Sequence, residues 1–198
     1  MVARRPAIAK SAVATGKGDD GTTGLLYGGR IAKDDPRTEA YGTVDEAVAA
    51  LGLARAELNE AGLDEIAESV LRWQRELFVV GADLAAAPDK RERLEDGVTR
   101  VSETMLDGVE VELALWESAI EMPREFVVPG ETPASAALEM ARVILRRAER
   151  RAIAADRASS LGSAWIVPYL NRLADLLWVL ARAAEQAAGA PVTTARVR

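Results

Sequence analysis

The stretch that decides the fold is LDEIAESVLRWQRELFVVGADL, residues 63–84. Its large apolar residues recur at alternating intervals of three and four positions: Leu63, Ile66, Val70, Trp73, Leu77, Val80 and Leu84. Residues at this spacing share one face of an α-helix, because a helix turns once in about 3.6 residues. A stripe this long is typical of a helix packed lengthwise against other helices, so the stretch predicts a helical bundle.

Similar apolar stripes flank this helix. One runs from Val44 to Leu58, and another runs from Leu94 to Ile120. Between the helix at 63–84 and the later stripe, the string APDKRER (87–93) contains Pro88, which has no N–H to continue a helix. We therefore expect a break there and a third helix that begins near Leu94.

The second half of the chain predicts two more helices. The loop EMPREFVVPGETP (121–133) ends in Thr132 and Pro133, a capping oxygen followed by a residue suited to the first helical position. The helix that follows is expected to reach about Arg157, where ASSLGS (158–163) breaks it. The stripe of the last helix consists of Leu170, Leu173, Leu177 and Leu180, with Pro168 in or near the first turn.

The N-terminal part is different in character. ATGKGDDGTTGLLYGGR (14–30) has six glycines in seventeen residues, which indicates a loop and neither a helix nor a regular strand. The predicted fold is therefore all-α: a single five-helix bundle with a glycine-rich N-terminal loop, spanning 15–188. Residues 189–198 are expected to be a C-terminal tail. The basic segment 1–14 is interpreted as a disordered tail or, alternatively, as a short transit peptide.

Composition excludes several kinds of chemistry. The 198-residue chain has no cysteine and no histidine, which excludes disulfides, the usual zinc sites and His-activated nucleophiles. A net charge of −6 argues against nucleic-acid binding, and no uncharged apolar run is long enough to span a membrane. We expect a cytoplasmic protein with no protein-borne metal site.

An arginine cluster stands out on this acidic chain. Five arginines occur within ten positions, namely Arg142, Arg146, Arg147, Arg150 and Arg151. On a helix, Arg142, Arg146 and Arg150 form one row, and Arg147 and Arg151 form the adjoining row. Taken alone, the cluster favours a solvated face with salt bridges to acidic neighbours, and a polyanion such as phosphate is the alternative, because it would relieve the repulsion between the arginines.

Two other features remain open when taken alone. Consecutive N–H groups of the glycine-rich loop, with Lys17, form a possible anion cradle, but the loop could equally be a flexible tether. Asn171 in YLNRLAD (169–175) predicts either a hydrogen bond between helices or a ligand contact.

Four motifs in order closely resemble one known family. They are TGKGDDGTTGLLYGGRIAKDDPRTEAYGTVDE, FVVPG, RVILRRAERR and PYLNRLADLLWVLAR. Together they are similar to the ATP:cob(I)alamin adenosyltransferases of the propanediol-utilisation type over about residues 15–188. The resemblance implies a five-helix bundle that assembles as a homotrimer with sites between subunits. It also implies transfer of the 5′-deoxyadenosyl group of ATP to Co(I) of a corrinoid, with release of triphosphate.

The resemblance assigns the site residues in two halves. The loop half binds ATP through Thr15, Gly16, Lys17, Gly18, Asp19, Thr23, Gly24 and Lys33. The half from the neighbouring subunit binds ATP through Arg146, Arg147, Glu149, Arg150 and Asn171. Arg146, Arg142 and Asp45 are also implied in catalysis, with Arg142 paired to Asp45 across the interface. Phe126 is implied to lie beneath the corrin ring. Arg151 is left as a solvated residue.

Some residues depart from the family pattern. The basic residue of the loop, Lys17, stands one position later than is usual, and Glu131 and Pro133 replace the glycine-richer sequence after FVVP. The resemblance further implies Mg²⁺, an electron donor such as a flavoprotein, and delivery to an adenosylcobalamin-dependent enzyme. The alternatives are a non-catalytic ATP or adenosylcobalamin carrier or sensor, and a helical interaction protein whose arginines bind acidic partners.

Overall fold

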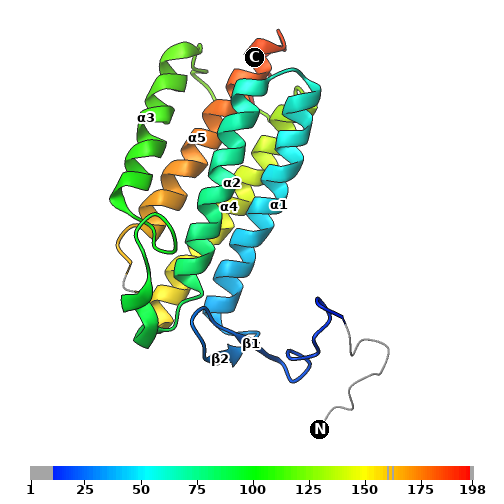
Figure 1. The fold of residues 1–198 in the computed structure, drawn as a ribbon. Helices are drawn as coiled ribbons and strands as arrows, with labels where there is room; N and C mark the ends of the chain where they lie inside the picture. The colour runs from blue at the N-terminus through cyan, green and yellow to red at the C-terminus, as the bar shows by residue number, and fades with distance from the viewer. Residues whose placement is uncertain (1–10, 160, 162, 197–198) are drawn as a thin grey trace.

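The computed structural model describes residues 11–159, 161 and 163–196, and in this part of the chain five long helices lie side by side (Figure 1). Their bounds are α1 (Pro36–Glu60), α2 (Asp64–Leu84), α3 (Glu103–Ala119), α4 (Pro133–Ser159) and α5 (Ile166–Ala187). The predicted all-α bundle is confirmed. Most of the segment 1–14, interpreted as a tail or transit peptide, lies outside the described residues. None of the described helices is long and apolar enough to cross a membrane.

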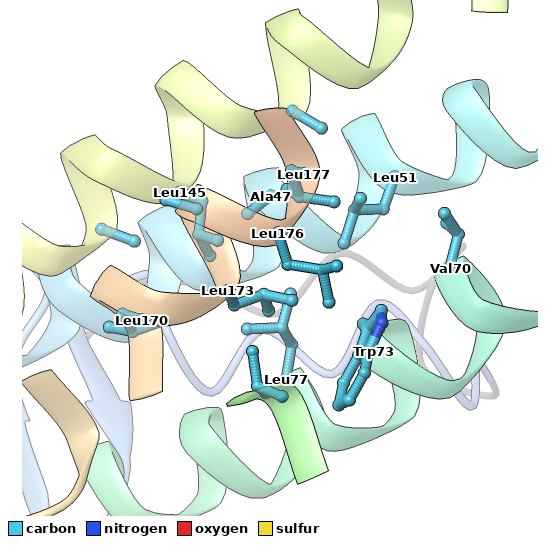
Figure 2. Close-up of a cluster of buried hydrophobic side chains, with 14 of the residues drawn as sticks. Ala47, Leu51, Val70, Trp73, Leu77, Leu145, Leu170, Leu173, Leu176 and Leu177 are labelled. Atoms are coloured by element: carbon cyan, nitrogen blue, oxygen red, sulfur yellow. The ribbon is translucent and has the colours of Figure 1, made fainter. Parts of the chain in front are cut away.

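Helix α5 is the centre of the bundle. It packs against α4, α3 and α2, whereas α1 packs against α2 and α4. Figure 2 shows how Leu173 and Leu176 of α5 meet Trp73 and Leu77 of α2, with Leu51 of α1 close by. Each of these side chains is fully buried, and their burial provides the main stabilisation of the fold.

Small residues line the contact between α1 and α4. Every seventh position of α1 is a buried alanine, and so is every seventh position of α4. These positions are Ala40, Ala47 and Ala54 on α1 and Ala134, Ala141, Ala148 and Ala155 on α4. Alanine side chains allow two helix backbones to approach closely, and this pair makes the most extensive contact in the bundle. Charged residues on the edges of the two helices therefore come within reach of each other.

The start of the third helix was predicted wrongly. The structure has a short 3₁₀ helix, η2 (Pro88–Arg93), and then a loop before α3 begins at Glu103. Gly97 has a φ of 73°, which a continuous helix does not allow, and Ser102 caps α3 by accepting a bond from Met105 N. Fully buried Asp83 holds the loop, because its carboxylate accepts from Arg91 at 2.6 Å and from Val101 N at 3.0 Å.

The glycine-rich segment is more regular than predicted. Strands β1 (Thr22–Gly24) and β2 (Arg30–Ala32) pair as an antiparallel hairpin, so the expectation of no regular strand was wrong. The turn is possible because Tyr27, Gly28 and Gly29 all have positive φ. Leu26 N donates to Ala85 O at 3.0 Å, which fixes the hairpin to the end of α2.

The remaining boundaries follow the sequence closely. Thr132 Oγ1 accepts from Ser135 N at 3.0 Å at the start of α4, as the capping pattern predicts. Pro168 lies in the first turn of α5, also as predicted. Residues 189–198 were expected to be a tail, yet Val127 pairs with Thr194 in an antiparallel bridge.

Candidate functional site

Arg30 organises the glycine-rich loop. Its guanidinium donates to Lys17 O at 2.5 Å, to Asp20 Oδ1 at 3.3 Å and to the Thr22 hydroxyl. Asp20 also accepts from the Thr22 hydroxyl and N–H at 2.8 and 2.9 Å, and these bonds together with the nearby Arg30 charge lower the pKa of Asp20. The carboxyl of Asp20 is thus kept ionised and turned toward Arg30.

Two lysines place positive charge on the loop, which also carries the exposed carboxylate of Asp19. Lys17 is exposed and pairs with no carboxylate of the described chain. A Cβ built on Gly18 would lie 2.9 Å from Lys33 Nζ and 3.2 Å from Thr22 O, so only glycine allows the Lys33 ammonium to lie this close. Gly16 adopts a φ of 66° beside them. An exposed glycine-rich turn with two ammonium groups is suited to bind an anion.

The remaining predicted loop residues lie in two places, the turn before the hairpin and strand β1. Thr15 and Asp19 are exposed in the turn before the hairpin, and Thr23 and Gly24 lie in β1. Thr15 Oγ1 accepts from Lys17 N at 3.5 Å. The structure therefore groups the loop half of the predicted site at one end of the bundle, where α1 begins (Figure 1).

The arginine cluster divides into two rows with different surroundings. Arg147 pairs with Glu46 of α1, and Arg151 pairs with Glu39 at 3.4 Å, so this row bridges α4 to α1. Arg151 was expected to be a solvated residue, and it is exposed; its ion pair with Glu39 lies at the surface.

The other row keeps two arginines available. Arg146 and Arg150 are exposed, and in the described chain neither pairs with a carboxylate; Arg150 only donates to Arg146 O at 2.9 Å. Two guanidinium groups one turn apart repel each other weakly. A multiply charged anion would relieve that repulsion, and arginine suits phosphate oxygens.

Arg142 belongs to a buried charge network. Its Nε donates to Glu139 Oε2 at 2.6 Å, and the other oxygen of Glu139 lies 3.4 Å from Nη2 of Arg182. Arg182 in turn pairs with Glu185 at 2.8 Å. The four side chains alternate in sign, and Arg182 and Glu185 are 1% exposed. Since only Nε of Arg142 is occupied, its two terminal amino groups remain available for a further partner.

A groove of about 790 Å³ opens beside Arg142. Its walls come from α3, α4, α5 and the loop at 121–132, and they combine apolar and charged groups. The lining includes Leu113, Met122, Pro123, Phe126, Val127, Trp178 and Val179 together with Glu139, Arg142, Arg172 and Asp175. Phe126 is 88% exposed, so it presents an aromatic face that nothing in the described chain covers. Such a mixed groove suits a large flat ligand with polar edges.

Asn171 connects α5 to α4. Its Nδ2 donates to Glu149 Oε1 at 3.3 Å, which is the hydrogen bond between helices that its position allowed. Asp45 is exposed on α1 and makes no ion pair within the described residues. It therefore does not contact Arg142 in the same chain.

The parts of the predicted site lie far apart in one chain. Arg37 at the start of α1 donates to Ser159 at the end of α4, so the glycine-rich hairpin lies near the C-terminal end of α4. The Phe126 loop immediately precedes the N-terminal end of α4. The groove extends from this loop along α4 to Arg142, which lies 17 residues, or about 25 Å, before the C-terminal end of α4.

Several residues of these sites were not identified from sequence. No sequence pattern identified Arg30 as a functional residue, apart from its position directly after Gly28 and Gly29. Arg182 and Glu185 are three positions apart in an apolar helix, and that i, i+3 pairing of opposite charges could have revealed them. No comparable sequence pattern identified Trp178 and Arg172, which line the groove.

Comparison with known proteins gives a consistent result. The family model described as cobalamin adenosyltransferase matches residues 13–184. A corrinoid adenosyltransferase of Citrobacter freundii is 41% identical over 172 residues, which cover 86% of this chain and 93% of the relative. A corrinoid adenosyltransferase of Bacillus subtilis is 37% identical over 177 residues, 88% of this chain and 87% of the relative.

Solved structures agree with the sequence comparison. A variant of the PduO-type ATP:corrinoid adenosyltransferase from Lactobacillus reuteri, complexed with cobalamin and ATP, has a TM-score of 0.84 to this chain. The two sequences are 28% identical, and the match covers 93% of this chain and 96% of the other.

Proposed function

The chain belongs to the cobalamin adenosyltransferase family and transfers the adenosyl group of ATP to a corrinoid, and we propose that it does so at a site shared between two copies of the chain. The observation that carries this proposal is the distance between the two groups of site residues. The loop lies near the C-terminal end of α4, whereas Arg146 lies 13 residues, or about 20 Å, before that end. The groove opens beside Arg142, about 25 Å before the same end.

A second copy of the chain resolves this separation. The loop of one copy would approach the Arg146 and Arg150 row of its neighbour, which has no acidic partner of its own. In a ring such contacts are head-to-tail, and a homotrimer is the ring that we propose. Asp45 of one copy would then bind the terminal amino groups of Arg142 in the next, which Glu139 leaves available.

The triphosphate is proposed to lie between the two halves. Lys17, Lys33 and the loop N–H groups would bind it from one side, and Arg146 and Arg150 from the other. These groups would stabilise the negative charge that grows on triphosphate as it leaves. Gly16, Gly18, Thr15, Asp19, Thr23 and Gly24 shape the loop, and Glu149 with Asn171 would contact the nucleoside. Arg147 would contribute through its charge while paired with Glu46.

Mg²⁺ is proposed to arrive with the nucleotide. Among the described residues no three acidic side chains gather as a cation site. Triphosphate oxygens bind Mg²⁺ well, so the ion fits as a component of MgATP and needs no protein cage.

The groove is proposed to bind the corrinoid. Phe126 would lie against the lower face of the ring, and Arg172 and Asp175 would bind polar groups at its edge. An aromatic wall excludes water and other lower ligands, and a chain without histidine offers no imidazole to replace them. Without a lower ligand the cobalt acceptor orbital falls in energy, which makes Co(II) easier to reduce.

The reaction then requires no protein nucleophile. Co(I) donates an electron pair to C5′ of ATP, the Co–C bond forms as the C5′–O bond breaks, and triphosphate departs with the bonding electrons. Cobalt becomes formally Co(III). The protein contributes alignment of the reacting atoms and stabilisation of the leaving group.

Partners outside the chain follow from this chemistry. Reduction of Co(II) to Co(I) needs one electron, for which we propose a flavoprotein donor. The product would pass to an enzyme that uses adenosylcobalamin. We propose a cytoplasmic setting, where ATP and reduced flavoproteins are present.

Arg146→Ala tests the proposed triphosphate site. We expect kcat/KM for ATP to fall by about 10²–10³, since one preorganised charge contact of this kind contributes about 3 kcal/mol. The measurement is the absorbance change on formation of adenosylcobalamin from ATP and chemically reduced Co(I) corrinoid. Arg75→Ala is the matched control, because Arg75 is an exposed arginine on α2, away from both halves of the site. Equal activity in the two variants would contradict the role of Arg146.

A further inference from the structure

The C-terminal part of the described chain runs beside the loop that carries Phe126. Val128 N donates to Thr193 O at 2.8 Å, and Ala195 N donates to Phe126 O at 2.8 Å. Thr194 pairs with Val127 between these two bonds in an antiparallel bridge. The segment Thr193–Ala195 therefore adds a short strand to residues 126–128.

This pairing is the main backbone anchor of the Phe126 loop. Between residues 122 and 131, the backbone forms two hydrogen bonds to described residues, and both go to the C-terminal strand. The entry to the loop is fixed separately, because Glu121 exchanges two bonds with the Gln186 side chain, at 3.0 and 2.7 Å. Gln186 lies in the last turn of α5, so both anchors come from the C-terminal part of the chain.

The direction of the Phe126 side chain depends on this backbone. The ring is 88% exposed, so contacts within the chain do not hold it. In a strand, consecutive side chains point to opposite faces, and the pairing of residue 126 with residue 195 decides which face residue 126 takes. An unpaired loop of this length would sample many conformations, and only a few of them would place the ring along the groove.

We propose that the C-terminal strand Thr193–Ala195 is a positioning element that holds Phe126 in place against the lower face of the corrinoid. The inference rests on the proposed role of Phe126 in excluding the lower ligand of cobalt. The strand itself does not line the groove beside Arg142; of its residues, Thr194 lines a separate hollow of about 490 Å³ behind the loop. Its effect would therefore pass through Phe126.

A pair of proline substitutions separates the backbone bond from other effects. Ala195→Pro removes the N–H that donates to Phe126 O. Thr194→Pro is the matched control, since Thr194 N forms no hydrogen bond with the described chain, and proline is tolerated at such an edge position. Both changes introduce the same residue at neighbouring sites of the full-length chain.

The measurements are two rates and one spectrum. The first rate starts from chemically prepared Co(I) corrinoid with MgATP, and the second starts from Co(II) corrinoid with a reduced flavoprotein. The electron paramagnetic resonance spectrum of bound Co(II) corrinoid reports directly whether a nitrogen lower ligand is present. Phe126→Ala serves as the reference for loss of the aromatic wall.

We expect Ala195→Pro to resemble Phe126→Ala. The rate from Co(II) should fall on the order of tenfold, the rate from Co(I) should stay within about twofold, and a nitrogen-ligated Co(II) signal should grow. Thr194→Pro should match the unchanged protein in all three measurements. If Ala195→Pro does not fold, a chain ending at Ala190, which lacks both bonds, is measured in the same way.

Other outcomes identify which idea fails. If Phe126→Ala slows the Co(II) route selectively and Ala195→Pro matches Thr194→Pro, the positioning role of the strand is overturned while the role of Phe126 stands. If Ala195→Pro slows both routes equally, the strand acts on the fold in general and the proposal is likewise overturned. If Phe126→Ala itself affects both routes equally, the proposed role of Phe126 falls, and the inference falls with it.

Discussion

Arg142 differs from the other arginines of its cluster because its surroundings are already negative. Buried Glu139 binds its Nε, Arg182 lies on the far side of Glu139, and Glu185 completes the alternation of charge. A buried carboxylate is stable only where cations compensate it. The network therefore fixes the side-chain direction of Arg142 at the wall of the groove before any ligand or second subunit arrives.

A double-mutant cycle at this pair measures how strongly the two residues are coupled. Glu139→Gln and Arg142→Met should each destabilise the fold, and the coupling energy should be about 1.5–3 kcal/mol, the usual range for a hydrogen bond to a charged group. The measurement is the free energy of unfolding in urea for the four proteins of the cycle. A coupling energy below about 0.5 kcal/mol would mean that the two side chains act independently.

The helices differ in how they meet their neighbours. The α1–α4 contact is built on alanines, and the short distance between backbones brings Arg147 and Arg151 of α4 onto Glu46 and Glu39 of α1. The α2–α5 contact instead contains a polar pair. Tyr169 of α5 donates to Glu76 of α2 at 3.0 Å, and burial raises the pKa of both groups, that of Tyr169 well above its ordinary value.

Glu76 predicts a pH dependence of stability at this helix contact. Because burial raises the pKa of Glu76 above its ordinary value of 4.5, the folded protein binds this proton at a higher pH than the unfolded chain does. The free energy of unfolding should therefore decrease as pH rises from 4.5 through the folded-state pKa. The decrease should be less than about 1 kcal/mol, since the carboxyl is only partly buried.

Glu76→Gln isolates this contribution. The variant cannot ionise at this position but keeps an oxygen that accepts from Tyr169. Relative to this variant, the unchanged protein should lose stability as pH rises from 4.5 through the folded-state pKa of Glu76, which urea unfolding at several pH values would show. Parallel stability curves for the two proteins would refute the assignment.

At the scale of the whole molecule, the two halves of the proposed site lie apart along one elongated bundle (Figure 1). Lys17 and Lys33 belong to the loop at one end, and Arg146 lies in the middle of α4. The proposed site between subunits predicts that activity requires assembly.

Mixing two inactive variants tests this shared site. Lys17→Ala together with Lys33→Ala disables the loop half, and Arg146→Ala disables the helix half. Each protein alone should be nearly inactive. After unfolding and refolding together in equal amounts, roughly a quarter of the sites in a head-to-tail ring should combine an intact loop with an intact helix.

Activity of the mixture is measured by formation of adenosylcobalamin from Co(I) corrinoid and MgATP. If the mixture recovers about a quarter of the rate of the unchanged protein, as expected when about one site in four is intact, the site lies between subunits. A mixture no more active than its components, with mixed oligomers demonstrated by mass, would place the whole site within one chain.

Much of the fold could be predicted because its signals are local. The stripe at 63–84 became α2 almost residue for residue, and Thr132 and Pro133 began α4 as expected. The third helix failed because Leu94 and Val101 are buried like residues of a helical stripe but belong to a loop. Asp83, far earlier in the chain, holds that loop through Arg91 and Val101, and periodicity cannot detect such a contact.

Glycine density, arginine spacing and the four motifs selected the loop, the Arg146 row and Phe126 as the candidate site, and their roles stay a prediction. The acidic partners of Arg147 and Arg151 could not be predicted from the sequence. Glu46 lies 101 residues before Arg147, and Glu39 is similarly far from Arg151 along the chain. Only the packing of α1 on α4 brings them together.

By itself, then, the sequence determined the five helices, apart from the start of α3, and the place of the glycine-rich loop, because helix periodicity, capping and glycine content act between residues close in the chain. The resemblance of the four motifs identified the family. Tertiary structure alone decided which arginines are neutralised, how Arg142 is held, and that the C-terminal strand pairs with the Phe126 loop. Each of these depends on groups distant in sequence that meet only when apolar faces are buried together. Burial of those faces is non-directional, and the side chains and backbone groups that it brings into reach then select specific partners.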